Sequence, residues 1–327
     1  MRRQSPLQRI QHLLHSHPAL SPLAVLVISF IIFTIINPSL ATPTPLSFIF
    51  QQVAVIAALA IGQTLIILTA GVDLSVGAIA IVSMLVMASL SAQQKLPGIL
   101  ALIIGVIVGT LCGLLNGLLV TRLRLPPFIV TLGTLSIFTA IALLYSGGKS
   151  IGRQQMDPLL SWTRTPIPIG TFTLTMGVII VIIMALIMSF VLSQTAWGRH
   201  VYAVGDDIEA ARLAGIRVNR VLLSVYTVAG LIYGITGWVA IGRAGGASAN
   251  AITNGNLESI TAVVIGGTSL FGGRGGIVGT MLGALIVYTF NQGLSLAHVD
   301  AQWRVLAVGL LIIVAVSLDQ WIRRVKA

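Results

Sequence analysis

The sequence of 327 residues carries very little charge. Lys and Arg number 19 and Asp and Glu number 8, which together make 8% of the chain, whereas hydrophobic residues make 56%. Ordinary soluble domains have about 25% charged residues. Because a water-soluble protein of this length could not cover its surface with so few, the composition excludes a soluble globular domain. It indicates a protein that crosses a membrane several times.

Cysteine and acidic residues are also scarce. The single cysteine, Cys112, cannot form an internal disulfide. The net charge of +11 would be compatible with nucleic-acid binding, but the basic residues are scattered singly between apolar runs and form no polar face. A bias of positive loops toward the cytoplasm explains the same residues. We therefore expect membrane lipid, and no nucleic acid, around this chain.

Sequence motifs of enzymes are missing as well. No phosphate loop ending in Gly-Lys-Ser/Thr, no HExxH and no nucleophile constellation occurs in the chain. We therefore expect no catalytic residue, no metal site and no bound cofactor on this chain.

Long apolar runs, in contrast, fill most of the sequence. A helix needs about 20 mainly apolar residues to cross the hydrocarbon of a membrane, and ten runs approach this length. They lie at 20–36, 50–70, 75–92, 97–121, 126–146, 169–193, 221–242, 257–271, 277–297 and 303–322. The expected fold is an all-α polytopic membrane protein of about ten transmembrane helices. Its transmembrane domain would cover 20–322, between cytoplasmic tails at 1–19 and 323–327.

The basic residues predict the orientation of these spans. With the N-terminus in the cytoplasm, the inner loops and tails hold thirteen of the nineteen Lys and Arg residues. We therefore predict that both termini are cytoplasmic. The loop at 194–220, between the sixth and seventh spans, then lies in the cytoplasm too.

A weak sequence similarity between two parts of the chain suggests an inverted repeat of five helices. Residues 114–137 align without gaps on residues 289–312, a shift of 175, and this pairs Asn116 with Asn291 and Val130 with Val305. A shift by an odd number of spans makes the two halves inverted, as in many transporters. Apolar sequences also align by chance, so coincidence is the alternative interpretation.

The cytoplasmic loop contains "GRHVYAVGDDIEAARLAGIRVNR" (198–220), which holds seven of the 27 charged residues. Asp206 is placed to cap a helix, with Glu209 as its capping-box partner. Glu209 and Arg212 have the spacing of an ion pair, and Gly215 suits the position after the helix. The pattern predicts a helix of about eight residues, which is marginal in isolation. Acidic residues, Asp207 included, disfavour lying on the negative inner leaflet, so docking into a cytoplasmic partner is favoured over a surface loop.

A second stretch, "GQTLIILTAGVDLSVGAIAIVSM" (62–84), places Asp73 between two apolar spans. An acid at a membrane boundary is costly unless it is paired or solvated, and such acids are often functional. Asp73 also suits the N-cap of the third span. We favour the cap, although a cap that lines a transport path would satisfy both interpretations.

A third stretch, "AVVIGGTSLFGGRGGIVGTMLGALI" (262–286), is rich in glycine. Small residues at these spacings allow helices to pack closely in lipid. The "GGRGG" segment around Arg274 is expected to form a tight turn between the eighth and ninth spans.

These three stretches resemble sequence signatures of ABC-importer permeases for monosaccharides. "GDDIEAARLAGI" is similar to the coupling loop of that family, and "GVDLSVG" and "GGTSLFGGRGGIVGTMLGA" are similar to two further signatures, in family order. The resemblance covers essentially the whole chain. It maps the core of the coupling loop onto Glu209, Ala210, Ala211, Arg212 and Gly215.

The resemblance implies a membrane subunit without a nucleotide site of its own. Its partners would be a cytoplasmic ATP-binding subunit, which carries ATP and Mg²⁺, a second permease subunit in a homo- or heterodimer, and a soluble extracytoplasmic sugar-binding protein. The implied location is the bacterial inner membrane.

Polar residues inside the spans are candidates for the sugar path because a neutral sugar needs hydrogen-bonding side chains without fixed charge. They are Gln63, Thr64, Asn116, Thr131, Thr134, Asn291 and Gln292, with Asp73 at a span boundary. For any one of them, a hydrogen bond between helices is the alternative role. An ATP-independent secondary transporter is a less favoured function, because ion-coupled carriers place ionisable groups within spans. Another small polar solute is also compatible with the sequence.

Overall fold

The computed structural model describes residues 20–300 apart from residue 253, and then 302–304, 306–307, 309–310 and 313. The tails predicted at 1–19 and 323–327 lie outside the described residues, as does most of the tenth predicted span at 303–322.

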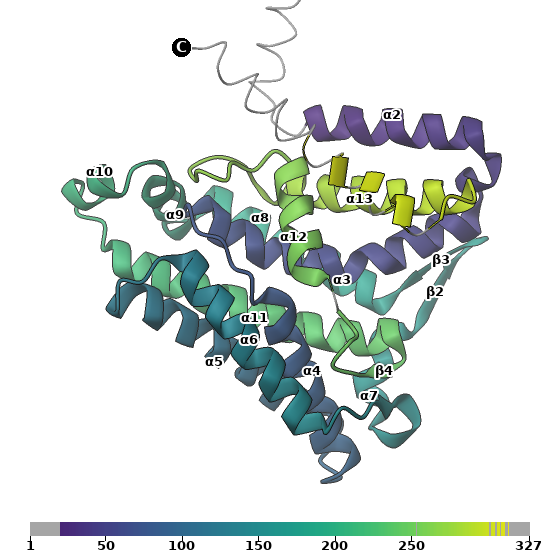
Figure 1. Cartoon of the computed structure of the whole chain (residues 1–327), viewed down its shortest axis with the longest axis horizontal. Coiled ribbons are helices and arrows are strands. Elements are labelled where there is room, and N and C mark those ends of the chain that lie inside the picture. Colours follow the sequence, from purple (N-terminus) through teal and green to yellow (C-terminus); the bar gives the residue numbers. More distant parts are fainter. Residues whose placement is uncertain are drawn as a thin grey trace, which may run out of the picture.

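Helices dominate the described part of the chain (Figure 1). The apolar helices are α2 (Leu20–Ile36), α3 (Pro43–Leu68), α4 (Val76–Ala92), α5 (Gly98–Arg122), α6 (Pro127–Ser146), α8 (Met176–Gln194), α11 (Val218–Ala244), α12 (Gly255–Ile265) and α13 (Ile277–Leu296). Six of them, α3, α5, α6, α8, α11 and α13, are long and apolar enough to cross a membrane, whereas α2, α4 and α12 are shorter. Each of the first nine predicted spans overlaps one of these helices, so the chain is a helical membrane protein, as its composition predicts.

Three predicted spans have wrong boundaries. The second was expected from residue 50, but α3 already starts at Pro43. The sixth was expected from residue 169, but Pro166–Ile169 (β2) and Phe172–Thr175 (β3) pair as an antiparallel hairpin and α8 starts only at Met176. The turn of this hairpin uses Gly170 at a φ of 61°. The eighth span was expected to reach residue 271, but α12 ends at Ile265. The segment after it contains glycines with positive φ, which the glycine-rich turn predicted around Arg274 requires.

Short elements connect the helices. They are the 3₁₀ turns Pro38–Ala41, Arg153–Gln155 and Trp162–Arg164, the helices α7 (Pro158–Ser161), α9 (Ala196–Asp206) and α10 (Ile208–Leu213), and the strands β1 (Ile151–Gly152) and β4 (Gly246–Ala247), which pair with each other.

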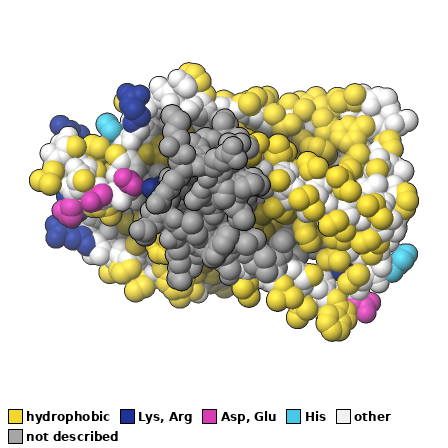
Figure 2. Space-filling view, turned by 90° about the horizontal axis from the view of Figure 1, so that it is seen from above, with side chains coloured by type: hydrophobic (Ala, Val, Ile, Leu, Met, Phe, Trp, Pro, Cys, Tyr) yellow, Lys and Arg dark blue, Asp and Glu magenta, His cyan; other side chains and the backbone are white. Residues whose placement is uncertain are grey.

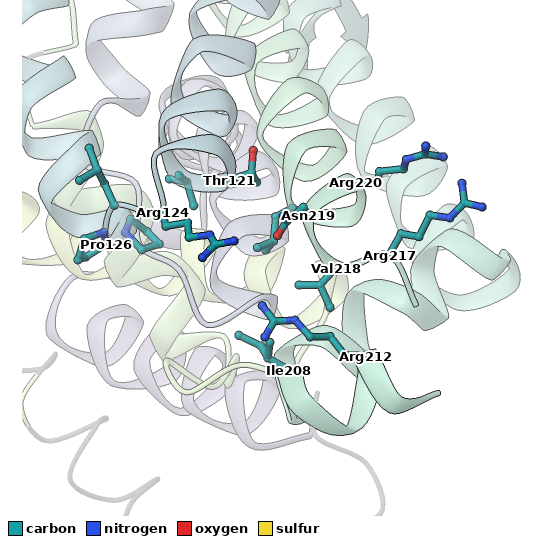
Figure 3. A pocket seen from close by; sticks show the side chains of 13 residues that line it. Thr121, Arg124, Pro126, Ile208, Arg212, Arg217, Val218, Asn219 and Arg220 are labelled. Atoms are coloured by element: carbon teal, nitrogen blue, oxygen red, sulfur yellow. The ribbon is translucent and has the colours of Figure 1, made fainter. Parts of the chain in front are cut away.

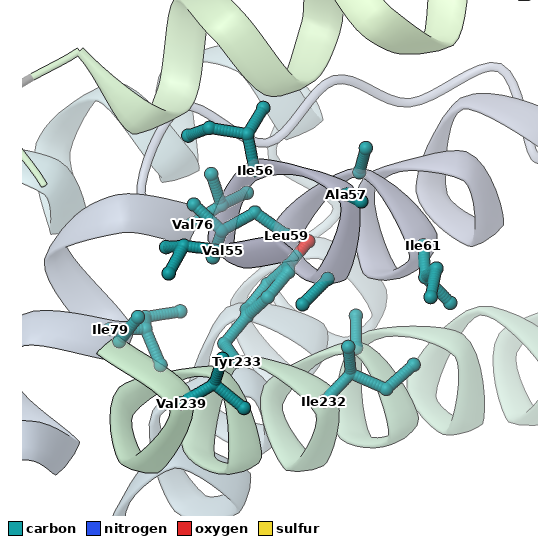
Figure 4. Packing of buried hydrophobic residues seen from close by; sticks show 14 of the residues in the cluster. Val55, Ile56, Ala57, Leu59, Ile61, Val76, Ile79, Ile232, Tyr233 and Val239 are labelled. Atoms are coloured by element: carbon teal, nitrogen blue, oxygen red, sulfur yellow. The ribbon is translucent and has the colours of Figure 1, made fainter. Parts of the chain in front are cut away.

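The core lies where α3, α4 and α11 meet (Figure 4). Tyr233 of α11 is fully buried and its ring lies against Gly62 of α3, where any larger residue would collide with it. Val55 and Leu59 of α3 and Ile79 of α4 surround this contact. Large apolar side chains on α2, α5, α6 and α8 remain exposed instead, as expected for helix faces that contact lipid.

Glycines allow the closest helix contacts. A Cβ atom at Gly113 of α5 would stand 2.7 Å from the Cα of Gly230 in α11. In the same way, Gly266 after α12 lies against Gly279 of α13. The second contact confirms that the glycine-rich stretch serves close helix packing.

The helix bounds repeat along the chain. Adding 175 to the bounds of α3 gives 218–243, close to the 218–244 of α11. The same shift carries α4 to 251–267, around α12, and α5 to 273–297, around α13. The contacts repeat as well, because α11 packs on α5 and α4 while α3 packs on α13 and α12.

Most charged side chains visible in Figure 2 lie at the left, the charged end, where Figure 1 places α9 and α10. A few acidic and His side chains lie at the right edge, and the surface between is rich in hydrophobic side chains in this view. Polar ends and apolar flanks are the arrangement expected of a protein that spans a membrane.

Candidate functional site

The charged end is built from two short helices, α9 and α10. Thr195 caps α9 by accepting a hydrogen bond from the backbone N–H of Gly198 at 3.1 Å. Asp207 separates the two helices and caps α10: its Oδ1 accepts from the backbone N–H groups of Glu209 at 2.8 Å and Ala210 at 3.0 Å. These bonds satisfy donors that the first turn of a helix leaves free.

The predicted cap at Asp206 is therefore wrong. Asp206 is the last residue of α9, and the capping box that would pair it with Glu209 is not formed. Either aspartate satisfies the sequence rule, and the choice of Asp207 follows from α9, which continues through Asp206. As a result α10 has six residues instead of about eight.

The end of α10 is as predicted. Gly215 has a φ of 82°, its N–H donates to the carbonyl of Arg212, and the N–H of Ile216 donates to the carbonyl of Ala211. This pair of bonds is a Schellman motif, which needs the left-handed residue that glycine supplies. The predicted pair of Glu209 and Arg212 is also present, with Oε1 of Glu209 and Nη1 of Arg212 2.6 Å apart.

One face of α10 points into solvent and carries an apolar side chain. Ala211 is buried against the protein, whereas Leu213 is 90% exposed and Ile208 is partly exposed. Leu213 stands among charged residues, away from the apolar flanks, so lipid does not account for it. Leu213 therefore adds an exposed apolar side chain to the charged surface of α10. Sequence reasoning missed Leu213 because its apolar neighbours in "EAARLA" suggested helix propensity alone.

The α9–α10 unit is joined to two distant parts of the chain. Gly205 near the end of α9 lies directly on the carbonyl of Leu68, the last residue of α3. The same carbonyl accepts a hydrogen bond from the N–H of Gly273 at 3.0 Å, in the turn between α12 and α13. The Tyr202 hydroxyl donates to the carbonyl of Gly275 at 2.8 Å, and burial raises the pKa of Tyr202. α9 is therefore in close contact with the end of α3 and with this turn.

A cavity of about 820 Å³ lies between α10 and the segment that joins α5 to α6 (Figure 3). Arg124 and Arg212 point into it, whereas Arg217 and Arg220 point away from it. Arg124 has a φ of 54°, so the connection turns sharply there. This cavity adds a positively charged concave surface beside α10.

The path candidates around Asp73 form a buried network. Asp73 is 1% exposed, and its Oδ1 accepts hydrogen bonds from the backbone N–H of Ser75 at 2.7 Å and from its hydroxyl at 2.6 Å. Asn116 donates to the same hydroxyl at 2.9 Å. Thr131 of α6 donates to the carbonyl of Val72 at 3.1 Å.

Asp73 was expected to cap the third span, but α4 begins at Val76 and its N-cap is Ser75. Residues 73–75 form a tight turn before α4, so the N-cap predicted from the sequence lies two positions too early. With its amide correctly oriented, Gln63 exchanges hydrogen bonds with the backbone N–H and carbonyl of Asp73. Asp73 thus ties the start of α4 to its neighbours.

Four other candidates do not share the hydrogen bonds of Asp73 and Ser75. Thr64 of α3 and Thr280 of α13 share a hydrogen bond of 2.7 Å, and Thr134 bonds within α6. Asn291 and Gln292 of α13 line a separate cavity of about 440 Å³, at the end of α13 away from α9 and α10. The structure therefore divides the eight predicted path residues among at least two places.

A charged end with an exposed, capped helix and polar residues buried between apolar helices are features that a membrane permease would have. Comparison with known sequences gives the family. Residues 46–316 match the family described as branched-chain amino acid transport system, permease component, and the chain belongs to this family.

Curated relatives cover nearly the whole chain. It is 49% identical to the fructose import permease protein FrcC of Rhizobium meliloti, over 98% of this chain and 90% of that protein. It is 39% identical to the ribose import permease protein RbsC of Bacillus subtilis, over 92% of each chain. It is 36% identical to the D-allose transport system permease protein AlsC of Escherichia coli, over 92% of this chain and 91% of that protein. No solved structure matches the chain.

Proposed function

We propose that this chain is the membrane-spanning permease subunit of an ATP-driven ABC importer and forms the path for a monosaccharide. The observation that carries the proposal is the match over nearly the whole chain to permeases named for fructose, ribose and allose. The buried polar side chains support it, because a neutral sugar exchanges its hydrogen bonds with water for bonds of this kind.

In this proposal α10 docks into the ATP-binding subunit. Asp206, Asp207, Glu209, Arg212 and the exposed Leu213 would form the contact. The buried Ala211 and Gly215, which has a left-handed backbone, would keep α10 in the conformation that this contact needs. Ala210 belongs to the same helix. The ATPase carries ATP and Mg²⁺, and its movements reach the spans through the contact of α9 with α3 and with the turn at 272–275.

The other proposed partners are a second permease subunit and a soluble sugar-binding protein on the opposite side of a bacterial inner membrane. The chain would have ten transmembrane helices with both termini cytoplasmic, in a transmembrane domain at 20–322 with its coupling loop at 194–220. The repeated helix bounds at a shift of 175 support an inverted five-helix repeat. Such a repeat allows alternating access by rocking one half against the other.

An amino acid is the second candidate for the solute, because the family description names branched-chain amino acids. A strain that lacks this permease, complemented with the chain, separates the two. We expect uptake of labelled fructose, ribose or allose to return and leucine uptake to stay at background. Restored leucine uptake without sugar uptake would reject the monosaccharide proposal.

A further inference from the structure

Resting on the proposed function, we infer that the cavity of about 440 Å³ beside α13 is the site where the sugar first binds on the extracytoplasmic side. Its polar lining includes Gln52, Glu258, Tyr288, Asn291, Gln292 and Arg304. These residues come from α3, α12, α13 and the segment after α13, so distant parts of the chain build it together.

The position of the cavity suits a site where the sugar first contacts the permease. It uses the beginning of α3 and the end of α13, whereas the opposite ends of these helices lie near α9. The side-chain amide of Asn37, which follows α2, donates to the carbonyl of Leu296 at 2.9 Å. This bond joins the end of α13 to the segment after α2. If α10 is cytoplasmic, the cavity faces the side on which a binding protein releases sugar.

The hydrogen-bonding groups of the cavity are only partly used within the described chain. The Glu258 carboxyl accepts one bond, from the Tyr288 hydroxyl at 3.1 Å. The Nε of Arg304 is buried without a hydrogen-bond partner among the described residues. The side chains of Asn291 and Gln292 likewise form no hydrogen bond within that part of the chain. Donors and acceptors that remain free in a partly buried cavity favour a ligand that supplies both.

Charged groups of both signs meet at the cavity. One carboxyl and one guanidinium line it. Arg243 adds a second guanidinium close to Glu258, and hydrogen bonds to Gln52 at 2.8 Å and to the carbonyl of Ala251 at 2.9 Å fix its position without cancelling its charge. Sugar hydroxyls can donate to the carboxyl and accept from the guanidinium and the amides.

The size and the apolar wall agree with a sugar. The volume lies in the range of small-molecule sites, about 300–1,000 Å³. Phe48 lines the cavity and is 47% exposed, so its ring can lie against the C–H face of a sugar ring.

Cysteine protection tests this site. Cys112 is the single cysteine, so Cys112→Ala gives a background in which Gln292→Cys is the target of a membrane-impermeant maleimide. Thr171→Cys, exposed in the β2–β3 turn, is the control on the same side. In intact cells that contain the whole transporter, the sugar transported by the unmodified chain should slow labelling of Gln292→Cys severalfold. Labelling of Thr171→Cys should stay unchanged, and leucine should protect neither.

The outcomes separate the site from the proposed function. Absence of uptake of fructose, ribose and allose by the unmodified transporter would reject the proposed function and this site with it. Labelling of Gln292→Cys that is absent, or identical with and without a transported sugar, would reject the site alone.

A second measurement uses acidic residues. Glu258→Gln removes the charged acceptor but keeps its shape, so the sugar concentration at half-maximal uptake should rise about tenfold or more. Asp300→Asn changes an exposed acid outside the cavity and should leave this value unchanged. Equal values in both variants would contradict a role of Glu258 in sugar binding.

Discussion

At the scale of single residues, the two adjacent aspartates before α10 differ in role although the sequence cannot tell them apart. Asp207 accepts two backbone N–H bonds, whereas Asp206 belongs to the preceding helix. Asp207→Ala should destabilise α10 by about 1 kcal/mol, the typical value for a lost N-cap. Amide hydrogen exchange across residues 208–213 should therefore quicken severalfold. Asp206→Ala is the matched control, and equal exchange in both variants would contradict the assignment.

Glu209 offers a test of docking that barely affects folding. Its ion pair with Arg212 is exposed, and such pairs contribute roughly 0.3–0.5 kcal/mol. Glu209→Lys should therefore insert into the membrane at normal levels but lose most of the ATPase stimulation by sugar-loaded binding protein. ATP hydrolysis in proteoliposomes measures this, with Asp300→Asn as the control. Normal sugar uptake by Glu209→Lys would refute the docking of α10.

At the scale of helices, glycine contacts decide how closely α5 and α11 approach. A side chain at Gly113 would collide with the backbone of Tyr226 and Gly230, which cannot move aside cheaply. Gly133 of α6 has nothing within 4 Å of its would-be Cβ. Gly113→Val should thus lower the midpoint of thermal unfolding in detergent, because overpacking typically costs about 1–3 kcal/mol or more. Gly133→Val should leave this midpoint unchanged. Equal midpoints for the two variants would contradict the close packing of α5 and α11.

Hydrophobicity predicted the long helices well and their ends less well. Residues 20–36 and 127–146 form helices almost where the apolar runs lie, because an apolar run of that length has few other stable arrangements in lipid. Residues 166–175 (PIPIGTFTLT) instead alternate apolar residues with Pro and Thr around Gly170, and they form the hairpin of β2 and β3. The end of α12 was misjudged because Gly266 and Gly267 were read as helix-packing residues only.

At the scale of the whole molecule, the orientation in the membrane is open to direct labelling. In the Cys112→Ala background, a membrane-impermeant maleimide applied to intact cells should leave Asp206→Cys unlabelled and should label Thr171→Cys. The two positions lie at opposite ends of the molecule in the proposed topology. Labelling of Asp206→Cys from outside would overturn the cytoplasmic location of α10.

The candidate sites were predictable to different degrees. The charged loop was found because seven charges stand together in the sequence, and its ion pair and terminal glycine follow local rules. The cavity that joins Gln52, Glu258, Gln292 and Arg304 was not found, because these residues meet only through helix packing. Asn291 and Gln292 were predicted only because they are polar residues in a span. Their position in the sequence does not show which side chains of other helices lie opposite them.

The most direct test of the whole account is ATP-dependent sugar uptake by purified components. Proteoliposomes would contain this chain with its ATPase, sugar-binding protein outside and ATP enclosed inside. The account predicts labelled-sugar accumulation with ATP and none with a non-hydrolysable analogue or without the ATPase. Equal accumulation in the absence of the ATPase would contradict it and identify a carrier that works without ATP.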